Sequence, residues 1–349
     1  MKPFRAAIYG GSGFAGAELV RRLLRHPDVD LVRVCSIDHV GELLSAAHPH
    51  LEGQTELRFE ELPPEKAAAD VDVVLLGLPH GASISVVEAL HPANVRVLDL
   101  SGAFRFSDAA AYARYYGSPH PRPDLSKEFV YGLPEVNRDR IRSARFVASP
   151  GCFATTIELS LLPLANEGLL GSSVDVVAIT GSSGSGVVPT PTTHHPVRAQ
   201  NLRTYKPLEH QHVPEIEATL GAVAGHAVSV HLVPVSAPLT RGIFSTAFVR
   251  VPEGVDAGRV DAAYRRFCER EPFVRVPRRR LPEVVAVSGS NFAEIGATVG
   301  PAQNGERVLT AFGALDNLVK GGAGQAIQNL NLMLGLDEKT TLEDVGGYP

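Results

Sequence analysis

The chain of 349 residues has little cysteine, no concentrated charge and no long apolar run. Its three cysteines are an odd number and lie far apart, which excludes a disulfide framework and suits a reducing compartment. No apolar run has the length that a bilayer requires, and the N-terminal residues form a strand pattern without the apolar core of a signal peptide. We therefore expect a cytoplasmic protein without a membrane partner.

Charge is spread thinly along the chain, and the formal net charge is −5. A nucleic-acid or membrane surface needs a concentration of basic residues, which is mostly missing. The exception is the stretch RVPRRR at residues 275–280, which is short and typical of a solvated loop. We expect no nucleic-acid partner.

Strand and helix patterns divide the chain into two parts, as its length suggests. The first part alternates apolar strands with helices, which predicts an α/β domain with a Rossmann-type, doubly wound parallel sheet. The second part has longer strands and few helices, which predicts an α+β domain with a mostly antiparallel sheet. We predict an NAD(P)-binding domain over 1–151, a catalytic, substrate and oligomerisation domain over 152–323, and a C-terminal helix at about 324–349 that returns to the first domain. The expected strands are at 4–9, 31–36, 71–78, 95–100, 174–180, 227–235, 243–251 and 307–312.

A glycine-rich loop follows the first expected strand and opens the first expected helix. Gly10, Gly13 and Gly16 have the spacing G-x-x-G-x-x-G, which lets the backbone approach a pyrophosphate at a helix N-terminus. The alternative is a tight turn with no ligand. The residues expected to contact a dinucleotide here are Gly10, Ser12, Gly13, Phe14, Ala15 and Gly16.

The end of the second expected strand bears on the choice between NAD and NADP. Ser36 is expected to contact the cofactor at this point. Asp38 favours a free ribose 2′-hydroxyl and therefore NAD, whereas Arg33 on the same strand has the opposite charge.

Cys152 stands in the stretch SPGCFATT, behind a Pro-Gly turn and ahead of a long apolar run. A helix N-terminus lowers the pKa of a thiol below its free value of roughly 8.5, so this cysteine is a candidate nucleophile. The alternative is a buried small hydrophobe, which is how Cys35 and Cys268 are interpreted. A thiolate beside a nicotinamide site indicates chemistry on an activated acyl group, which also needs an acid/base and a cation.

Two histidines in the stretch EHQHVPE are the candidate acid/base groups, His210 and His212. Glu215 is placed to orient an imidazole if a helix begins just before it. The His-x-His spacing also fits a metal site that His194 and His195 would complete, but no further Cys or Asp cluster fits a zinc pattern, so we expect no metal. Two surface histidines in a loop are the remaining alternative.

Polar residues follow other expected strand ends, where ligands of open α/β sheets bind. Arg105 is placed to hold a phosphate or carboxylate, with a surface salt bridge as the alternative. Pro79 and His80 are expected to line the nicotinamide pocket. The loop at 181–196 is long enough to indicate a function, and Asn317 in a late polar loop is placed to reach the cofactor.

These pieces occur in an order that resembles the N-acetyl-γ-glutamyl-phosphate reductases of arginine biosynthesis. The chain also resembles their sister branch, which reduces carrier-protein-linked aminoadipyl or glutamyl phosphate in lysine and arginine biosynthesis. Both branches belong with the aspartate-semialdehyde dehydrogenases. The resemblance covers nearly the whole chain through the ordered segments GGSGFAG, LPHG, DLSGAFR, YGLPE, SPGCFAT, GSSGSG, HHPVR, YKPLEHQHVPEI, RGIFST and DNLVKGGAGQA.

The resemblance implies reduction of an acyl phosphate to a semialdehyde with release of phosphate, by an oxidoreductase that acts on the aldehyde group. It makes Cys152 the nucleophile that forms an acyl-thioester, His212 the acid/base and Glu215 its orienting carboxylate. It makes His210 and Arg105 the substrate binders. The residues it implies for closing around the cofactor are Ser183 and Gly184, within the loop 182–186, and Asn317.

The resemblance also implies NADPH as the cofactor, because the family generally uses it. Ile37 and Asp38 stand where relatives usually carry Arg or another polar residue. The contact to the 2′-phosphate is therefore where this sequence departs from the family pattern.

Two segments favour different substrates. HHPVR resembles the carrier-linked branch, whereas HQHVPEI resembles the acetylated-substrate branch, and we favour N-acetylglutamyl phosphate. A small acidic carrier would need a basic surface, for which the chain offers Arg198, Arg203, Lys206 and Arg278–Arg280. We expect a homodimer or homotetramer through the sheet of the second domain.

Two other classes of protein remain as alternatives. One is a cysteine hydrolase that uses Cys152 and His212, and the other is a non-enzymatic dinucleotide sensor. Neither explains why a dinucleotide loop, an activated thiol and an anion-binding arginine occur together.

Overall fold

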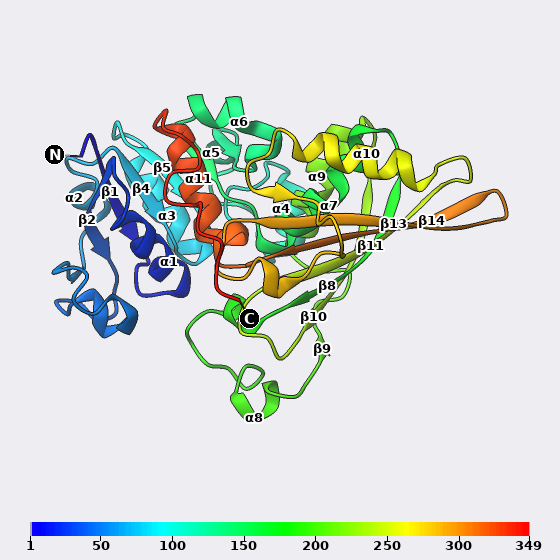
Figure 1. Ribbon diagram of the computed structural model, residues 1–349. Coiled ribbons are helices and arrows are strands. Elements are labelled where there is room, and N and C mark those ends of the chain that lie inside the picture. Colours follow the sequence, from blue (N-terminus) through cyan, green and yellow to red (C-terminus); the bar gives the residue numbers. More distant parts are fainter. Residues whose placement is uncertain (1, 349) are drawn as a thin grey trace. The chain divides into compact units, whose positions relative to one another are not determined.

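Two seven-stranded sheets organise the chain in a computed structural model that describes residues 2–348 (Figure 1). Each sheet forms the centre of one unit. Unit 1 consists of the residues up to 113, 118–151 and 322–343, and unit 2 consists of 114–117, 152–321 and the residues from 344 onward.

The sheet of unit 1 has the strand order β3-β2-β1-β4-β5-β7-β6, and all its pairings are parallel. Its central strands are continuous apolar runs because both faces of a parallel sheet are covered; the four residues of β4 are all buried. The strand order reverses between β1 and β4, the point where open α/β sheets bind ligands. The strands are β1 (Phe4–Tyr9), β2 (Val29–Cys35), β3 (Phe59–Glu60), β4 (Val73–Leu76), β5 (Arg96–Asp99), β6 (Phe129–Tyr131) and β7 (Phe146–Ala148).

Helices of unit 1 connect these strands, and one helix comes from the end of the chain. α11 (Gly324–Met333) is buried along its whole length and packs among α1, α6 and β5, so it appears in orange and red beside blue and cyan elements in Figure 1. The side chain of Asn331 on α11 bonds the fully buried His26 at 2.8 Å. The other helices are α1 (Phe14–Leu23), α2 (Pro64–Ala67), α3 (His80–Leu90), α5 (Pro123–Ser126), α6 (Pro134–Ser143), η1 (Leu44–Ala46) and η2 (Pro49–Leu51).

The sheet of unit 2 has the strand order β12-β13-β14-β11-β8-β10-β9. It is mostly antiparallel, with parallel pairings between β8 and β10 and between β12 and β13. The expected fold class, a doubly wound parallel sheet plus a mostly antiparallel one, is therefore confirmed. The strands are β8 (Ser173–Thr180), β9 (Arg203–Thr204), β10 (Ser229–Ser236), β11 (Ile243–Pro252), β12 (Val274–Arg275), β13 (Ala293–Gln303) and β14 (Glu306–Leu315).

Side chains of β8 and β11 alternate between buried and accessible, as in a sheet covered on one face. The covering helices are α7, α9 and α10, which pack on the strands of this sheet. The helices of unit 2 are α7 (Cys152–Asn166), α8 (His195–Arg198), α9 (Val213–Ala224), α10 (Ala257–Cys268), η3 (Ser182–Ser185) and η4 (Val284–Ala286). Two further helices, α4 (Ala109–Tyr116) and η5 (Val319–Ala323), are divided between the units.

The expected solvated loop at 275–280 holds for Arg278, Arg279 and Arg280, which are exposed and lie outside any strand, whereas Arg275 belongs to β12. The stretch also has a structural role, because the guanidinium groups of Arg275 and Arg280 hold the buried carboxylate of Glu294 at 3.1 Å and 2.6 Å. A buried carboxylate needs such partners to offset its lost hydration. Among residues 2–348 no helix is both long enough and apolar enough to span a membrane.

Candidate active site

The glycine loop of unit 1 is built around close backbone contacts. An added Cβ at Gly10, whose φ is +79°, would lie 2.3 Å from the carbonyl oxygen of Gly77, and one at Gly16 would lie 2.4 Å from that of Gly11. No side chain fits at Gly10 or Gly16, so the fold requires glycine at both positions whether or not a ligand binds. At Gly13 an added Cβ would meet only one carbonyl oxygen, at 3.8 Å, so the space in front of this residue is open to a ligand.

The N-terminus of α1 lies at the same loop. Gly13 is its N-cap residue and contributes no side-chain cap to the first backbone N–H groups. Such N–H groups and the positive end of the helix dipole suit a pyrophosphate. Phe14, the first residue of the helix, is 40% exposed, so it does not close the space off. The loop thus fits a dinucleotide, and Ala15 belongs to the same first turn.

At the end of β2 two hydroxyl groups lie against the loop. The Ser36 hydroxyl donates to the Ser12 hydroxyl at 2.9 Å and accepts the backbone N–H of Asp38 at 3.0 Å. Arg33 is directed elsewhere, since its guanidinium donates to the carbonyl of Ala69 at 2.7 Å. Arg33, the basic side chain on β2, therefore bonds a group other than the two serines.

Three further predicted residues follow β4 and β5. Pro79 is the exposed N-cap residue of α3, and Nδ1 of His80 accepts the backbone N–H of Gly102 at 2.8 Å. Arg105 donates from Nε to the carbonyl of Ser149 at 2.8 Å and from Nη2 to that of Leu100 at 2.9 Å. Arg105 therefore joins the loop after β5 to the segment that leads into Cys152.

The fully buried Asp99 supports this loop from β5. Its carboxylate accepts the backbone N–H of Ser101 at 3.0 Å and the Ser101 hydroxyl at 2.7 Å. Burial raises the pKa of the Asp99 carboxyl. These bonds fix the backbone just ahead of Arg105.

Cys152 is the first residue of α7 in unit 2. The Thr156 hydroxyl donates to its carbonyl at 2.8 Å, and an added Cβ at Gly321 would lie 2.8 Å from the Cys152 Cβ. The other thiols are held protonated, because burial raises the pKa of Cys35 to about 11 and that of Cys268 to about 12. Cys152 is thus the thiol with a helix N-terminus to stabilise a thiolate.

Aromatic rings and both candidate histidines gather beside α7. The Phe153 ring lies 5.2 Å from the His210 ring and 6.0 Å from the His212 ring, and the two imidazoles are 4.6 Å apart. Nδ1 of His210 accepts the backbone N–H of His212 at 3.2 Å, which leaves the His210 proton on Nε2 in the neutral ring. Glu215 in the first turn of α9 is buried, with its carboxylate 4.0 Å from Nε2 of His212.

The serine-glycine loop is held by Asn317, which is only 4% exposed. The Asn317 amide donates to the Ser183 hydroxyl at 3.1 Å and accepts the backbone N–H of Gly242 at 2.8 Å. An added Cβ at Gly184 would lie 3.8 Å from the same amide. These bonds use the Asn317 side chain to fix the loop in place.

Family models match both units. Residues 5–144 match the model described as semialdehyde dehydrogenase, NAD binding domain, and residues 152–317 match semialdehyde dehydrogenase, dimerisation domain. The chain belongs to the semialdehyde dehydrogenase family. It is therefore an NAD(P)-binding oxidoreductase, which removes the hydrolase and sensor alternatives.

Relatives in this family come from both expected branches. An N-acetyl-gamma-glutamyl-phosphate reductase of Methanosphaera stadtmanae is 41% identical over 100% of both chains. A putative [LysW]-L-2-aminoadipate 6-phosphate reductase of Thermomicrobium roseum is 40% identical over 98% of both. Aspartate semialdehyde dehydrogenase II of Vibrio cholerae shares the fold, with a TM-score of 0.73 at 17% identity over 96% of this chain and 99% of that one. Within the semialdehyde dehydrogenases, this chain belongs to the acyl-phosphate reductase branch.

The sequence did not indicate two neighbours of Cys152 in this semialdehyde dehydrogenase. Tyr205 is near enough for the charge of Cys152 to raise the pKa of its phenol, after the larger effect of burial. Its ring also lies 5.8 Å from that of His210. Gly321 is the second neighbour. The sequence does place Tyr205 close to both histidines, within the segment YKPLEHQH, and this nearness could have indicated it.

The remaining alternatives concern metals and other cavities. Among residues 2–348 no group of His, Cys, Asp or Glu side chains could hold a metal ion, and His194 and His195 are exposed.

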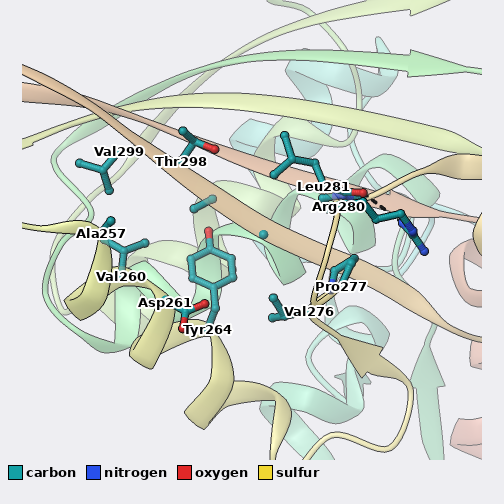
Figure 2. A pocket seen from close by; sticks show the side chains of 13 residues that line it. Ala257, Val260, Asp261, Tyr264, Val276, Pro277, Arg280, Leu281, Thr298 and Val299 are labelled. Atoms are coloured by element: carbon teal, nitrogen blue, oxygen red, sulfur yellow. Dashed lines mark hydrogen bonds between the residues drawn. The ribbon is translucent and has the colours of Figure 1, made fainter.

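A cavity of about 260 Å³ lies between α10, β13 and the segment 276–282 (Figure 2). Tyr264 and Leu281 line it, but none of the predicted site residues does.

Proposed function

We propose that the protein catalyses NADPH-dependent reduction of N-acetyl-γ-glutamyl phosphate to N-acetylglutamate 5-semialdehyde, with release of phosphate. The observation that carries this proposal is the position of Cys152 at the N-terminus of α7, in the unit that also contains both histidines. The names of the relatives support the substrate.

Cys152 is the proposed nucleophile. Its thiolate attacks the acyl carbon, so that a C–S bond forms, the C–O bond to phosphate breaks and phosphate leaves. When bound, NADPH supplies the hydride that reduces the thioester carbon. The C–S bond then breaks, which returns the sulfur and releases the aldehyde.

Proton transfers in this reaction are assigned to His212. An imidazole with a pKa near roughly 6.5 takes and returns a proton close to neutrality. Glu215 stabilises the imidazolium form from 4.0 Å, and its burial strengthens that interaction. We assign the neighbouring His210, together with Arg105, to substrate binding.

The cofactor is proposed to bind at the glycine loop with its pyrophosphate before α1. The Ser12 and Ser36 hydroxyls lie where they can donate hydrogen bonds to a ribose 2′-phosphate, and we propose NADP because the family that the chain resembles generally uses it. Pro79, His80, Ser183 and Gly184 are proposed to contact the cofactor, and Asn317 to hold the loop that carries Ser183.

A carrier-linked substrate is the second candidate, because relatives of nearly equal identity carry that name. Arg203, Arg278 and Arg279 are exposed and offer positive charge to a small acidic carrier. Arg280 contributes less, since its guanidinium is paired with Glu294.

Oligomerisation is proposed to use the open face of the unit 2 sheet, as a homodimer or homotetramer. Val177, Phe248 and Val308 are 38%, 44% and 44% exposed on that face. Apolar exposure of this kind and the match to a dimerisation domain support the assignment. We place the enzyme in the cytoplasm, in keeping with its free cysteines.

The reverse reaction tests the function directly. Wild-type protein should reduce NADP⁺ with N-acetylglutamate semialdehyde in a phosphate-dependent manner, and Cys152→Ser should abolish this turnover while NADPH titration shows near-normal binding. Full activity of the variant would end the thioester proposal. No turnover by a wild-type protein that still binds NADPH would favour the carrier-linked substrate.

A further inference from the structure

His48 belongs to the segment 36–58, which links β2 to β3 in unit 1. This segment contains two short helices, η1 and η2, and His48 is the N-cap residue of η2. Its backbone N–H donates to the carbonyl of the fully buried Leu44 at 3.0 Å. The His48 side chain is 5% exposed, so the imidazole lies inside the unit.

The His48 imidazole bonds the glycine loop directly, with Nε2 2.7 Å from the carbonyl oxygen of Gly11. A carbonyl oxygen only accepts hydrogen bonds, so Nε2 is the donor. Burial lowers the pKa of His48 below its usual 6.5, although the bond to Gly11 raises it in part. The ring is therefore neutral near neutral pH, and its single N–H is on Nε2.

The Gly11 carbonyl is part of the peptide unit that joins Gly11 to Ser12. On the other side of Gly11, its backbone N–H donates to the carbonyl of Cys35 at 3.1 Å. A glycine has wide backbone freedom, so the peptide unit that follows Gly11 can rotate unless another group holds it. His48 holds it by binding the carbonyl oxygen.

The same peptide unit contains the backbone N–H of Ser12. A trans peptide is planar and its N–H points opposite to its C=O, so the bond from His48 also fixes the direction of this N–H. No protein group within residues 2–348 accepts it. Ser12 directly precedes Gly13, the N-cap residue of α1, where the helix dipole attracts a phosphate.

We propose that His48 is a positioning residue for the dinucleotide, which holds the Gly11 carbonyl so that the Ser12 N–H points towards a pyrophosphate oxygen. The inference rests on the pyrophosphate site proposed above and adds a residue from outside the glycine loop. An N–H that is already oriented loses less freedom on binding, so the bond from His48 increases the affinity for the cofactor.

Two substitutions of similar size separate this hydrogen bond from packing. In His48→Gln the amide nitrogen can replace Nε2 as the donor, whereas His48→Met fills similar space without a donor. The Kd of NADPH, measured by fluorescence titration, should rise on the order of 10-fold in His48→Met and less than about threefold in His48→Gln. His50→Gln is the matched control at an exposed histidine of the same segment and should bind as wild type. NADH replaces NADPH if wild type binds it more tightly.

Displacement of the bound cofactor shows which part of the dinucleotide is affected. ADP-ribose contains the pyrophosphate, and adenosine 2′-monophosphate does not. In His48→Met the Ki of ADP-ribose should rise as much as the Kd of NADPH, whereas the Ki of adenosine 2′-monophosphate should stay within about threefold. Adenosine is the corresponding fragment for a protein that prefers NADH.

Equal affinities of His48→Met and His48→Gln for the cofactor, whether lowered or unchanged, would overturn the proposal. An equal loss for both displacing ligands would also overturn it, because it would show that the whole cofactor site is disturbed. If the melting curve shows that His48→Met does not fold, His48→Asn replaces it, since its amide is one carbon too short to reach Gly11. A folded wild-type protein that binds neither cofactor would refute the pyrophosphate site itself, and the proposed function with it.

Discussion

Gly321 limits where Cys152, the proposed nucleophile, can lie, and its replacement by alanine is a sharp test of the site. The added Cβ would stand 2.8 Å from the Cys152 Cβ and 3.1 Å from Cδ1 of Leu315. Carbon atoms in contact are normally about 3.5–4.0 Å apart, so one of these groups must move by about 0.7 Å or more. Rotation of a side chain cannot relieve the contact, because the Cβ of Cys152 is fixed to the start of α7.

The expected loss of activity follows from that displacement. A misplacement of about 1 Å at a reacting atom costs on the order of 100-fold in rate. Overpacking should also destabilise the fold by about 1–3 kcal/mol. We therefore expect Gly321→Ala to lower kcat/KM of the reverse reaction about 30- to 100-fold, with a folded protein of reduced Tm.

The matched control is Gly171→Ala in the same unit, because an added Cβ there meets no atom within 4 Å. The assay is kcat/KM together with the melting temperature and the alkylation rate of Cys152. Activity of Gly321→Ala within about threefold of Gly171→Ala, at a lowered Tm, would refute the argument that this contact fixes the proposed nucleophile, Cys152.

Two further predictions concern protons. His212→Asn should lower kcat by about 100-fold or more, whereas His210→Asn should act mainly on KM; a larger loss of kcat in His210→Asn would reverse the assignment. Burial opposes ionisation of Glu294, but hydrogen bonds from Arg280 and from the Glu283 backbone, together with the charges of Arg280 and Arg275, outweigh it and hold the pKa of Glu294 below its usual 4.5. The resulting stability is complete above pH 4.5 and is lost as the pH falls through the lowered folded value, so the urea midpoint should drop below pH 4.5 less steeply in Glu294→Gln than in wild type.

Local patterns made part of the fold predictable. The first strand, the glycine loop and Cys152 at the start of α7 were expected because each depends on neighbouring residues: an apolar run, small residues at a turn, and a Pro-Gly pair ahead of a helix. β13 was not expected, since its sequence AEIGATVGPAQ contains two glycines and a proline that disfavour a strand. The segment nevertheless forms a strand, because it pairs with β14 over most of its length. The register of this pairing shifts between Val299 and Ala302, which lie on either side of the proline.

The site was less predictable than the fold, because its contacts join distant parts of the chain. Gly321 and Cys152 are far apart in sequence, and only the folded chain brings their Cβ positions together. Arg198 was expected at most on a carrier surface, yet it bonds the end of β8. Asn317 was expected at the cofactor, but its amide is used by Ser183 and Gly242.

The late return of the chain to unit 1 affects the order in which the protein can fold as it is synthesised. Almost all of unit 2 lies between residues 152 and 321, so the ribosome synthesises it before it reaches α11. Until then the nascent first unit lacks the partner of the buried His26 and the Thr341 carbonyl that receives the Arg22 guanidinium. Unit 2 can therefore form most of its contacts first, and unit 1 closes its core only after α11 and Thr341 have been synthesised.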